Sequence, residues 1–533
     1  MVVNTIFRGG SVLTMDCEGT VHEAAAVSGN KIFCVGSDEE VMKLAGADTQ
    51  IIDLKGRSLI PGLIDSHLHS AVFGLNFLAI DCRSPGVGSI EEIKELIRQA
   101  AAKTPKGQWI RGWGYDHSKL KEKRHPNKWD LDEAAPDHPV MLTRCCAHIS
   151  THNSKSLALG GIDDSSEAPE GGEYERIDGK VSGVMFENAH MDMMKVSMPD
   201  KTEIINAMKA ANDFLVKQGI TTVHDSGGYG ATQMDAIQEA SAAGILKLRM
   251  YTMIFSFVEN VSFVNNYLGI GIHTGFGNEK YRLGPTKIMI DGSSSGPTAA
   301  TLEPYASNPN SCGIMSMNQD QIEDIVLRAH KGGWQMTCHA IGDKAITVIM
   351  DALEKAIQAY PREDHRHRIE HSAMMNDELL GRMKKLGIVP VPQPVFLYEF
   401  GDGYMRNYGE KRAYRMFPCK SYVDYGIIAA GSSDCPITFS NPFLNMYMAA
   451  NRKTQTGQVI NEAECVTPLE ALKMFTWNGA YASFEEGVKG SIEAGKLADL
   501  VVLSRDFLTT PREEIKDITA DLTMIDGEIV YQA

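Results

Sequence analysis

The sequence has 533 residues, of which 43% are hydrophobic and 23% charged, and this composition excludes disordered, collagen-like and coiled-coil chains. At about 150 residues per domain, the length allows three or four domains, or one large barrel with additions. The formal net charge of −16 disfavours non-specific binding to nucleic acid or to an anionic membrane. We therefore expect a small molecule as the partner.

The N-terminal residues lack a basic segment followed by a long apolar one, so we expect no secretory signal, and no apolar run is long enough to span a bilayer. The ten cysteines are scattered without a CxxC pair, which favours reduced, buried thiols and a cytoplasmic protein. Adjacent Cys145 and Cys146 would point to opposite faces of a strand, which favours packing over redox or metal chemistry. We further expect a homo-oligomer, namely a dimer.

Both ends of the chain have the texture of small β structure. Residues 1–57 contain short β-like runs at 5–7, 24–27, 31–35 and 50–54, broken by Gly, Asp and Asn. The C-terminal runs are 500–503, 522–525 and, after the turn dipeptide Asp526-Gly527, 529–531. We expect residues 1–57 and 485–533 to pair into one β-sandwich domain.

Between the two ends, apolar β runs alternate with longer helical patterns, which is typical of β/α units and a parallel sheet. The candidate strands are 58–64, 221–224, 248–254, 286–290, 335–339, 368–371, 388–392 and 427–431. Eight such runs predict an α/β fold, a (β/α)8 TIM barrel formed by residues 58–81 and 216–484. In this fold the chemistry lies at the carboxyl ends of the strands.

The interval 82–215 is too long for one helix and two loops, so it predicts an inserted lobe, which we place over the barrel mouth. It holds an aromatic and glycine-rich stretch at 109–115 and an acidic, glycine-rich, hairpin-like segment at 163–183. A basic loop carries Lys119, Lys121, Lys123 and Arg124. We interpret the charged runs as solvated surfaces.

Two histidines end the first barrel strand. Residues i and i+2 share a face of a strand, so His67 and His69 present two imidazoles side by side toward the mouth, an arrangement that suits a divalent metal. His365 and His367 form the same pattern. They lie at the start of a strand, however, at the opposite end of the barrel, and we assign them no ligand role.

Three further ligand-type residues end other strands and face the same mouth: His339, His371 and Asp434. Five such side chains therefore converge from four strands. Imidazole and carboxylate together suit zinc or a similar first-row metal.

These residues resemble the amidohydrolase superfamily, and within it the YtcJ-like members, known as amidohydrolase family 3. The resemblance covers almost the whole chain, and its most specific motifs are PGLIDSHLH at 61–69, CHAIGDKA at 338–345, RIEHS at 368–372, GSSDCPI at 431–437 and GSIEAGKLADLVVL at 490–503. It implies a hydrolase that cleaves amide or related C–N bonds with water activated on one or two divalent metal ions, zinc in the first place.

The resemblance also implies ligand roles. His67, His69 and Asp434 would hold the more buried metal, and His339 and His371 a second one. A carboxylated lysine bridges the two metals in binuclear members, and the matching position is Lys287. Lys287 lies four residues before Asp291, deep in its strand, and a buried salt bridge to Asp291 or Glu187 is the alternative.

In the implied mechanism Asp434 takes a proton from the attacking water and passes it to the leaving nitrogen, while the metal on His339 and His371 polarises the carbonyl. A purely structural ligand role for Asp434 is the alternative. Trp113, Tyr115 and Asp116 of the lobe are candidate substrate contacts, with packing as the alternative.

Two rival functions stay open at the level of sequence. One is a mononuclear hydrolytic deaminase on the same barrel, although residues 340–343, which follow His339, lack the glutamate that such enzymes use. The other is a non-catalytic scaffold, although every ligand position is filled.

Overall fold

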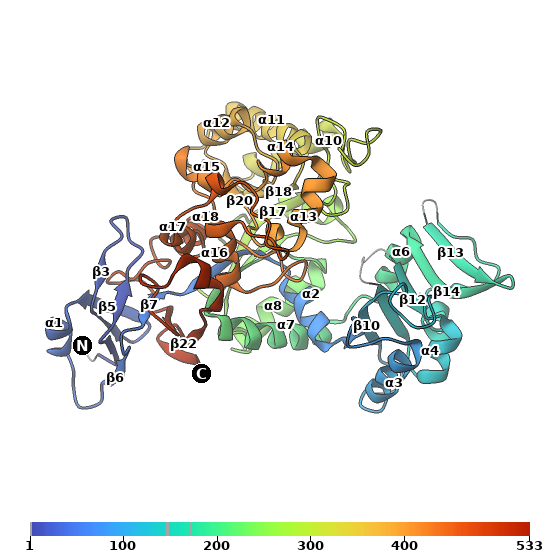
Figure 1. Ribbon diagram of the computed structural model, residues 1–533, viewed down its shortest axis with the longest axis horizontal. Helices are drawn as coiled ribbons and strands as arrows, with labels where there is room; N and C mark the ends of the chain where they lie inside the picture. Colours follow the sequence, from blue (N-terminus) through green and yellow to red (C-terminus); the bar gives the residue numbers. More distant parts are fainter. Residues whose placement is uncertain (1–2, 145–148, 170–171) are drawn as a thin grey trace. The chain divides into compact units, whose positions relative to one another are not determined.

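The computed structural model describes residues 3–144, 149–169 and 172–533 (Figure 1). The chain divides into two compact units, one formed by residues 1–70 and 211–533 and the other by residues 71–210. Cys145 and Cys146 lie outside the described residues, and the cysteines that are described carry free thiols. A membrane-spanning helix is absent from the described part of the chain.

The first unit is built on a seven-stranded parallel sheet. Its strands, in spatial order, are β8 (Leu63–Leu68), β15 (Ile220–Asp225), β16 (Arg249–Ile254), β17 (Tyr281–Met289), β18 (Met336–Ala340), β19 (Arg368–His371) and β20 (Val389–Val391). Helices follow the strands: α8 (Gly230–Ala242), α9 (Val261–Leu268), α10 (Gln319–Lys331), α11 (Asp343–Ala359) and α12 (Asp377–Leu386). Strand order equals chain order, as in an α/β barrel.

The sheet has seven strands where the sequence predicted eight. Residues 427–431 form no strand, although they lie between β20 and β8: Ala430 N–H donates to Pro390 O (3.0 Å), and Gly431 O accepts from Ser66 N–H (3.1 Å). Gly431 N–H donates instead to Met474 O (2.9 Å). The segment closes the barrel, but its backbone groups are shared among different neighbours and do not form a regular ladder.

The predicted strand 58–64 belongs to two sheets. β7 (Ser58–Pro61) pairs with β2 (Ser11–Leu13) and with β21 (Leu500–Leu503), while β8 begins at Leu63. Gly62 makes the crossing, and a Cβ on this residue would lie 2.2 Å from the Thr221 hydroxyl. Only glycine therefore lets the chain pass this close to β15.

Strands from both chain ends pair with each other. The six-stranded sheet has the order β23 (Glu528–Gln532), β22 (Ala520–Ile525), β21, β7, β2, β3 (Val21–His22). The four-stranded sheet has the order β5 (Lys31–Gly36), β4 (Ala24–Ser28), β1 (Thr5–Arg8), β6 (Gln50–Asp53). Helix α1 (Asp38–Met42) follows β5 in the chain and packs against β4, β5 and β1. Buried side chains of both sheets, among them Phe7, Leu59 and Val502, form one hydrophobic cluster.

The rest of the first unit is helical. After β20 the chain forms α13 (Phe396–Tyr408), α14 (Glu410–Ala413), α15 (Cys419–Asp424), α16 (Pro442–Asn451), α17 (Pro468–Met474) and α18 (Trp477–Ala482). The N-terminus of α17 has the local signals of a helix start: the Thr467 side chain caps the Glu470 N–H, Glu470 returns to the Thr467 N–H, and Pro468 follows the cap.

The second unit contains a six-stranded sheet. Its order is β13 (Gly172–Ile177), β14 (Lys180–Glu187), β12 (Ile149–His152), β11 (Val140–Arg144), β10 (Ile110–Tyr115), β9 (Ile80–Asp81). Its helices are α2 (Ser70–Leu78), α3 (Ile90–Ala101), α4 (Lys128–Ala134), α5 (Ser154–Leu159), α6 (Asn188–Val196) and α7 (Lys201–Leu215), of which α2 and α7 cross the unit boundary. Ser89 and Glu92 cap α3, whose Ile90, Ile93 and Ile97 form a core with Tyr115.

Candidate metal centre and active site

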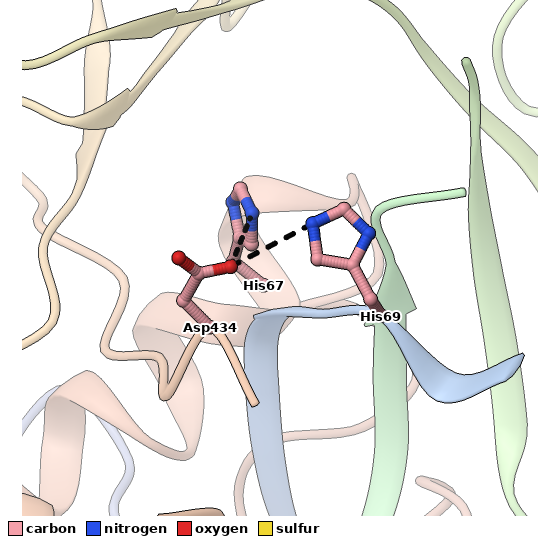
Figure 2. A group of neighbouring side chains, drawn as sticks. All are labelled: His67, His69 and Asp434. Atoms are coloured by element: carbon pink, nitrogen blue, oxygen red, sulfur yellow. Dashed lines mark ion pairs between the residues drawn. The ribbon is translucent and has the colours of Figure 1, made fainter. Parts of the chain in front are cut away.

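Two histidines and one carboxylate meet at the carboxyl end of β8. His67 lies in β8, His69 follows it, and Asp434 comes from the irregular segment beyond Gly431. Asp434 Oδ1 lies 3.3 Å from His67 Nε2 and 3.6 Å from His69 Nε2 (Figure 2). The ligand atoms of this buried group all lie within 4.8 Å of one another, which is close enough to share a metal ion.

The remaining nitrogen of each imidazole is held by a hydrogen bond. His67 Nδ1 bonds to Glu370 Oε2, and His69 Nδ1 lies 2.8 Å from Gly227 O. A carbonyl oxygen only accepts, so His69 Nδ1 carries the proton and Nε2 keeps its lone pair. Burial lowers the pKa of His69 to about 3, which keeps the ring neutral. Both imidazoles thus turn Nε2 toward Asp434 and hold the other ring nitrogen in a hydrogen bond. Zinc-binding histidines are held by the same kind of hydrogen bond.

Asp434 is held in an unusual backbone conformation. Its φ of 55° lies in the left-handed region, and its N–H donates to His67 O (2.7 Å). The preceding Ser433 donates both its N–H (3.1 Å) and its hydroxyl (2.6 Å) to Asp65. Burial raises the pKa of the Asp434 carboxyl to about 7. The surrounding hydrogen bonds therefore fix a residue whose backbone and charge state are both costly, which is typical of functional sites.

His339 and His371 form a second pair beside the first. Their ring centroids are 4.4 Å apart, and the His371 ring lies 5.2 Å from that of His67. His371 Nδ1 is 2.8 Å from Gln393 Oε1, and Gln393 in turn donates to Ser432 Oγ (2.9 Å). His339 Nε2 lies 3.2 Å from Gly292 O. The four histidines named from sequence therefore line one site, together with Asp434.

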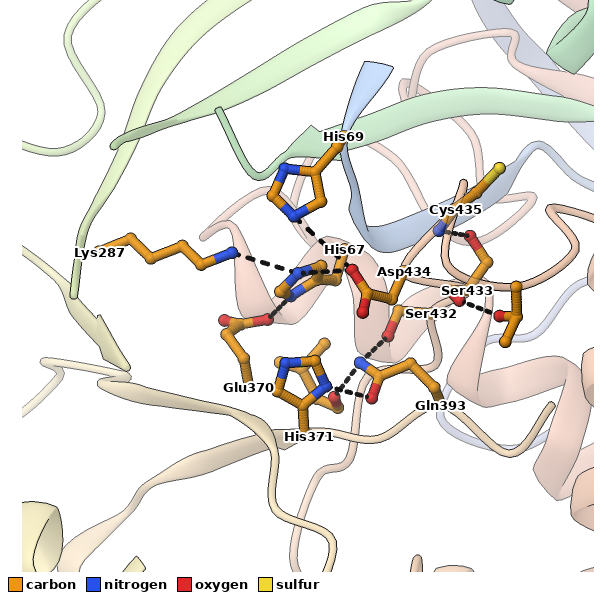
Figure 3. Close-up of polar contacts among 12 residues, drawn as sticks. His67, His69, Lys287, Glu370, His371, Gln393, Ser432, Ser433, Asp434 and Cys435 are labelled. Carbon is orange, nitrogen blue, oxygen red and sulfur yellow. Dashed lines mark hydrogen bonds and ion pairs between the residues drawn. The ribbon is translucent and has the colours of Figure 1, made fainter. Parts of the chain in front are cut away.

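Lys287 reaches this site from inside β17. Its Nζ lies 3.2 Å from His67 Nε2 and 5.0 Å from the centre of the Phe255 ring, and the residue is 2% exposed (Figure 3). In the described residues it forms no ion pair with Asp291, which accepts backbone N–H groups from Ala300 (3.0 Å) and Gly342 (2.9 Å). Burial lowers the pKa of Lys287 to about 8.

Glu370 and Arg368 were missed by the sequence analysis. Glu370, which is 0% exposed, accepts from His67 Nδ1, from the Thr337 hydroxyl, and from Arg368 Nε (2.9 Å) and Nη2 (3.1 Å). Arg368 also donates to Ser66 O (2.6 Å). A sequence signal existed, because Arg368 and Glu370 are two residues apart in a strand and therefore share a face. A charge buried inside a barrel is costly unless an opposite charge lies beside it, so the two residues are expected to pair.

This donor set fits a divalent metal ion. Imidazole and carboxylate ligands suit zinc, and a carboxylate behind a ligating histidine is the usual outer support of such a site. A structural role alone would not require three buried ligand atoms to converge while the hydrogen-bonded nitrogens of both imidazoles point away from them.

The lobe residues proposed to contact substrate lie in the second unit. The Tyr115 hydroxyl is buried and lies 3.0 Å from both His125 Nδ1 and Thr151 Oγ1. Asp116 accepts from Arg144 Nη2 (3.1 Å), and the guanidinium of Arg83 lies 5.0 Å from the centre of the Trp113 ring. Their contact with a substrate, and the place of the lobe over the barrel mouth, stay predictions.

The second HxH pair makes structural contacts. His365 and His367 stack with ring centroids 4.5 Å apart. His367 Nε2 lies 2.8 Å from His330 Nδ1, and His367 Nδ1 accepts the Met336 N–H (2.9 Å). Both nitrogens of His367 are thus engaged within the protein, at the start of β18 and β19.

The profile of the Amidohydrolase family matches residues 50–531 of the chain. The chain belongs to the amidohydrolase family. The resemblance drawn from its motifs is confirmed, including that to the YtcJ-like members: the chain is 29% identical to the putative amidohydrolase YtcJ of Bacillus subtilis, over 99% of its own length and 100% of that protein's. It is also 30% identical to the N-substituted formamide deformylase of Arthrobacter pascens, over 100% of its own length and 98% of that protein's.

A solved structure supports the same fold. An uncharacterised metal-dependent hydrolase from Pyrococcus furiosus is 27% identical and superposes with a TM-score of 0.81, over 95% of this chain and 100% of that one. The α/β barrel is therefore that of amidohydrolases, and the chain is a member of a family of hydrolases that act on carbon–nitrogen bonds.

Proposed function

We propose that this amidohydrolase cleaves the amide bond of a small N-substituted amide, with N-formyl amines as the first candidates, at a metal site formed by His67, His69 and Asp434. The observation that carries the proposal is the buried group of three ligand atoms at the carboxyl end of β8. The substrate class is supported by the full-length similarity to an N-substituted formamide deformylase.

The second half of the proposed site consists of His339, His371 and Lys287. A carboxylated Lys287 would add an oxygen ligand to those of the histidines, and the 3.2 Å distance between its Nζ and His67 Nε2 supports this assignment. When bound, a divalent ion supplies Lewis acidity and a water that ionises near neutral pH.

The protein's own part in the reaction is proton transfer. Both histidine contacts of Asp434 are made by Oδ1, and no hydrogen bond to Oδ2 is present in the ranges the structure describes. We propose that Oδ2 accepts the proton of the attacking water. The water oxygen bonds to the amide carbon, the C–N bond breaks, and Asp434 delivers the proton to the leaving nitrogen, which gives a carboxylic acid and an amine.

The deaminase alternative has weaker support. Two 5-methylthioadenosine/S-adenosylhomocysteine deaminases are 24% and 31% identical to the chain, but over only 30% and 26% of it. Residues 340–343 lack the expected glutamate, and Lys287 has no role in a mononuclear deaminase site.

The free thiols of the described cysteines support the proposed cytoplasmic location.

The proposal is tested by incubating protein loaded with zinc or manganese with N-benzylformamide, N-benzylacetamide and 5-methylthioadenosine. We expect equal molar release of formate and benzylamine from the formamide, no release after chelation, and recovery when the metal is restored. Ammonia release from the nucleoside without amide cleavage would decide for the deaminase. Protein that binds no metal when zinc is supplied would overturn the site assignment.

A further inference from the structure

A separate cavity lies at the opposite end of the barrel from the metal site. It has a volume of about 310 Å³, and residues just before β18 and β19, together with the start of β17, line it, including Arg282, Gln335 and Arg362. The metal ligands lie at the carboxyl ends of β8, β18 and β19, so the two sites occupy opposite ends of the same strands. Nothing in the proposed reaction uses this cavity.

The charge on the cavity wall is positive. Arg362 donates to two backbone carbonyls, those of Trp334 (2.8 Å) and His330 (3.3 Å), but its Nε is buried and has no hydrogen-bond partner among the described residues. Across those same residues none of its nitrogens forms an ion pair with a carboxylate. A buried guanidinium donor without an acceptor is costly, and Arg362, which carries this donor, is one of the residues that line the cavity.

One carboxylate, Asp364, lies on the cavity wall itself. It bonds both Nε (2.8 Å) and Nη2 (2.9 Å) of Arg366, a guanidinium that Glu486 also bonds (2.8 Å). Glu485, which lies 3.4 Å from Arg282 Nη1, also lies 2.7 Å from the Nζ of buried Lys489. Of the Arg, Lys, Asp and Glu residues that line the cavity, Arg282 and Arg362 outnumber Asp364, so the wall keeps an excess of one positive charge.

We propose that this cavity binds a small organic anion, a metabolite with one carboxylate or phosphate group, at Arg362 and Arg282. Guanidinium groups bind both kinds of anion through paired N–H donors. The volume is at the lower end of ligand pockets, and the Phe484 ring on its wall provides an apolar surface for the rest of the molecule. Gly275 and Gly333 also line the cavity, and a Cβ on Gly275 would lie 3.1 Å from Arg282 Nη2.

Titration calorimetry on the metal-loaded protein tests the site with benzoate, phenyl phosphate and the neutral analogue benzamide. The two anions separate a carboxylate from a phosphate ligand, and benzamide tests the need for charge. We expect one of the anions to bind and benzamide not to bind. In the variant Arg362→Gln the dissociation constant of that anion should rise at least about tenfold, the effect of losing one charge-assisted pair.

Arg505→Gln is the matched control, because it removes the same charge from an exposed arginine that pairs with Glu514 (2.8 Å) and does not line the cavity. It should leave the dissociation constant unchanged. If Arg362→Gln fails to fold, Arg362→Lys is used instead, since it keeps the charge but lacks the paired N–H donors of a guanidinium, and its affinity should also fall. Equal affinity of the folded Arg362 variant and the parent, or no binding of either anion, would overturn the proposal.

Discussion

Glu370 offers the sharpest test of the proposed metal centre, since its carboxylate bonds the far nitrogen of His67, a proposed ligand. Its two oxygens face four donors: Thr337 Oγ1 and Arg368 Nε on Oε1, Arg368 Nη2 and His67 Nδ1 on Oε2. In Glu370→Gln one oxygen becomes an NH2 group. The single remaining amide oxygen serves one side only, so the NH2 group must face either His67 or the Arg368–Thr337 side.

The size of the effect follows from these contacts. If the oxygen stays with His67, the ring keeps its orientation but loses a charged partner, and losing such outer support typically weakens metal binding 10–100-fold, or about 1.4–2.7 kcal/mol. Arg368 loses its buried counter-ion at the same time, which typically costs about 3–5 kcal/mol of folding free energy. We expect both losses in one variant.

Zinc affinity by competition with a fluorescent chelator, and unfolding by calorimetry with and without zinc, measure the two losses separately. Thr337→Val is the control: it removes a donor to Glu370 but leaves both Arg368 and His67 bonded to it, so zinc affinity should stay near that of the parent. A folded Glu370→Gln protein that binds zinc within twofold of the parent would refute the reasoning, because His67 would then not depend on the carboxylate.

Two further predictions concern Asp434 and Lys287. Asp434→Asn should leave a folded protein that still binds some metal, with kcat for an amide substrate lower by at least about a hundredfold, since the amide cannot take the proton of water; a rate near that of the parent would contradict the shuttle role. Lys287→Ala should lose metal and activity, and short carboxylic acids added to the assay should restore part of both; loss without rescue would indicate a salt-bridge lysine.

The sequence predicted the barrel well where strands are regular. The run 368–371 coincides with β19. The boundaries of the runs 221–224 and 248–254 each lie within one residue of the boundaries of β15 and β16. The prediction failed for the run 58–64, where a single residue takes the chain from one sheet to another. Gly62 passes the chain from β7 to β8 because a Cβ there would meet Thr221, a contact between residues far apart in sequence that no local pattern contains.

In the site, the sequence analysis predicted the ligand types but missed the residues that support them. Alternation along β19 would put Glu370 and His371 on opposite faces. His371, however, has a φ of 70°, so its side chain leaves the strand pattern and turns toward His339 while Glu370 stays on the inner face. A periodic interpretation therefore finds His371 or Glu370, and only the backbone conformation brings both to one site.

The balance of buried charge bears on whether Lys287 is carboxylated. Five buried groups close to His67 carry formal charge when ionised: Arg368 and Lys287 as cations, and Glu370, Asp434 and Asp65 as anions. Their sum is −1 while Lys287 is an ammonium, so these groups would compensate a divalent ion only in part, and the uncompensated charge is costly in a medium of low dielectric constant. A carbamate would replace one positive charge with one negative charge and bring the sum to −3. The five groups would then offset the whole charge of a divalent ion, and this balance favours the proposed carboxylation of Lys287 when metal is bound.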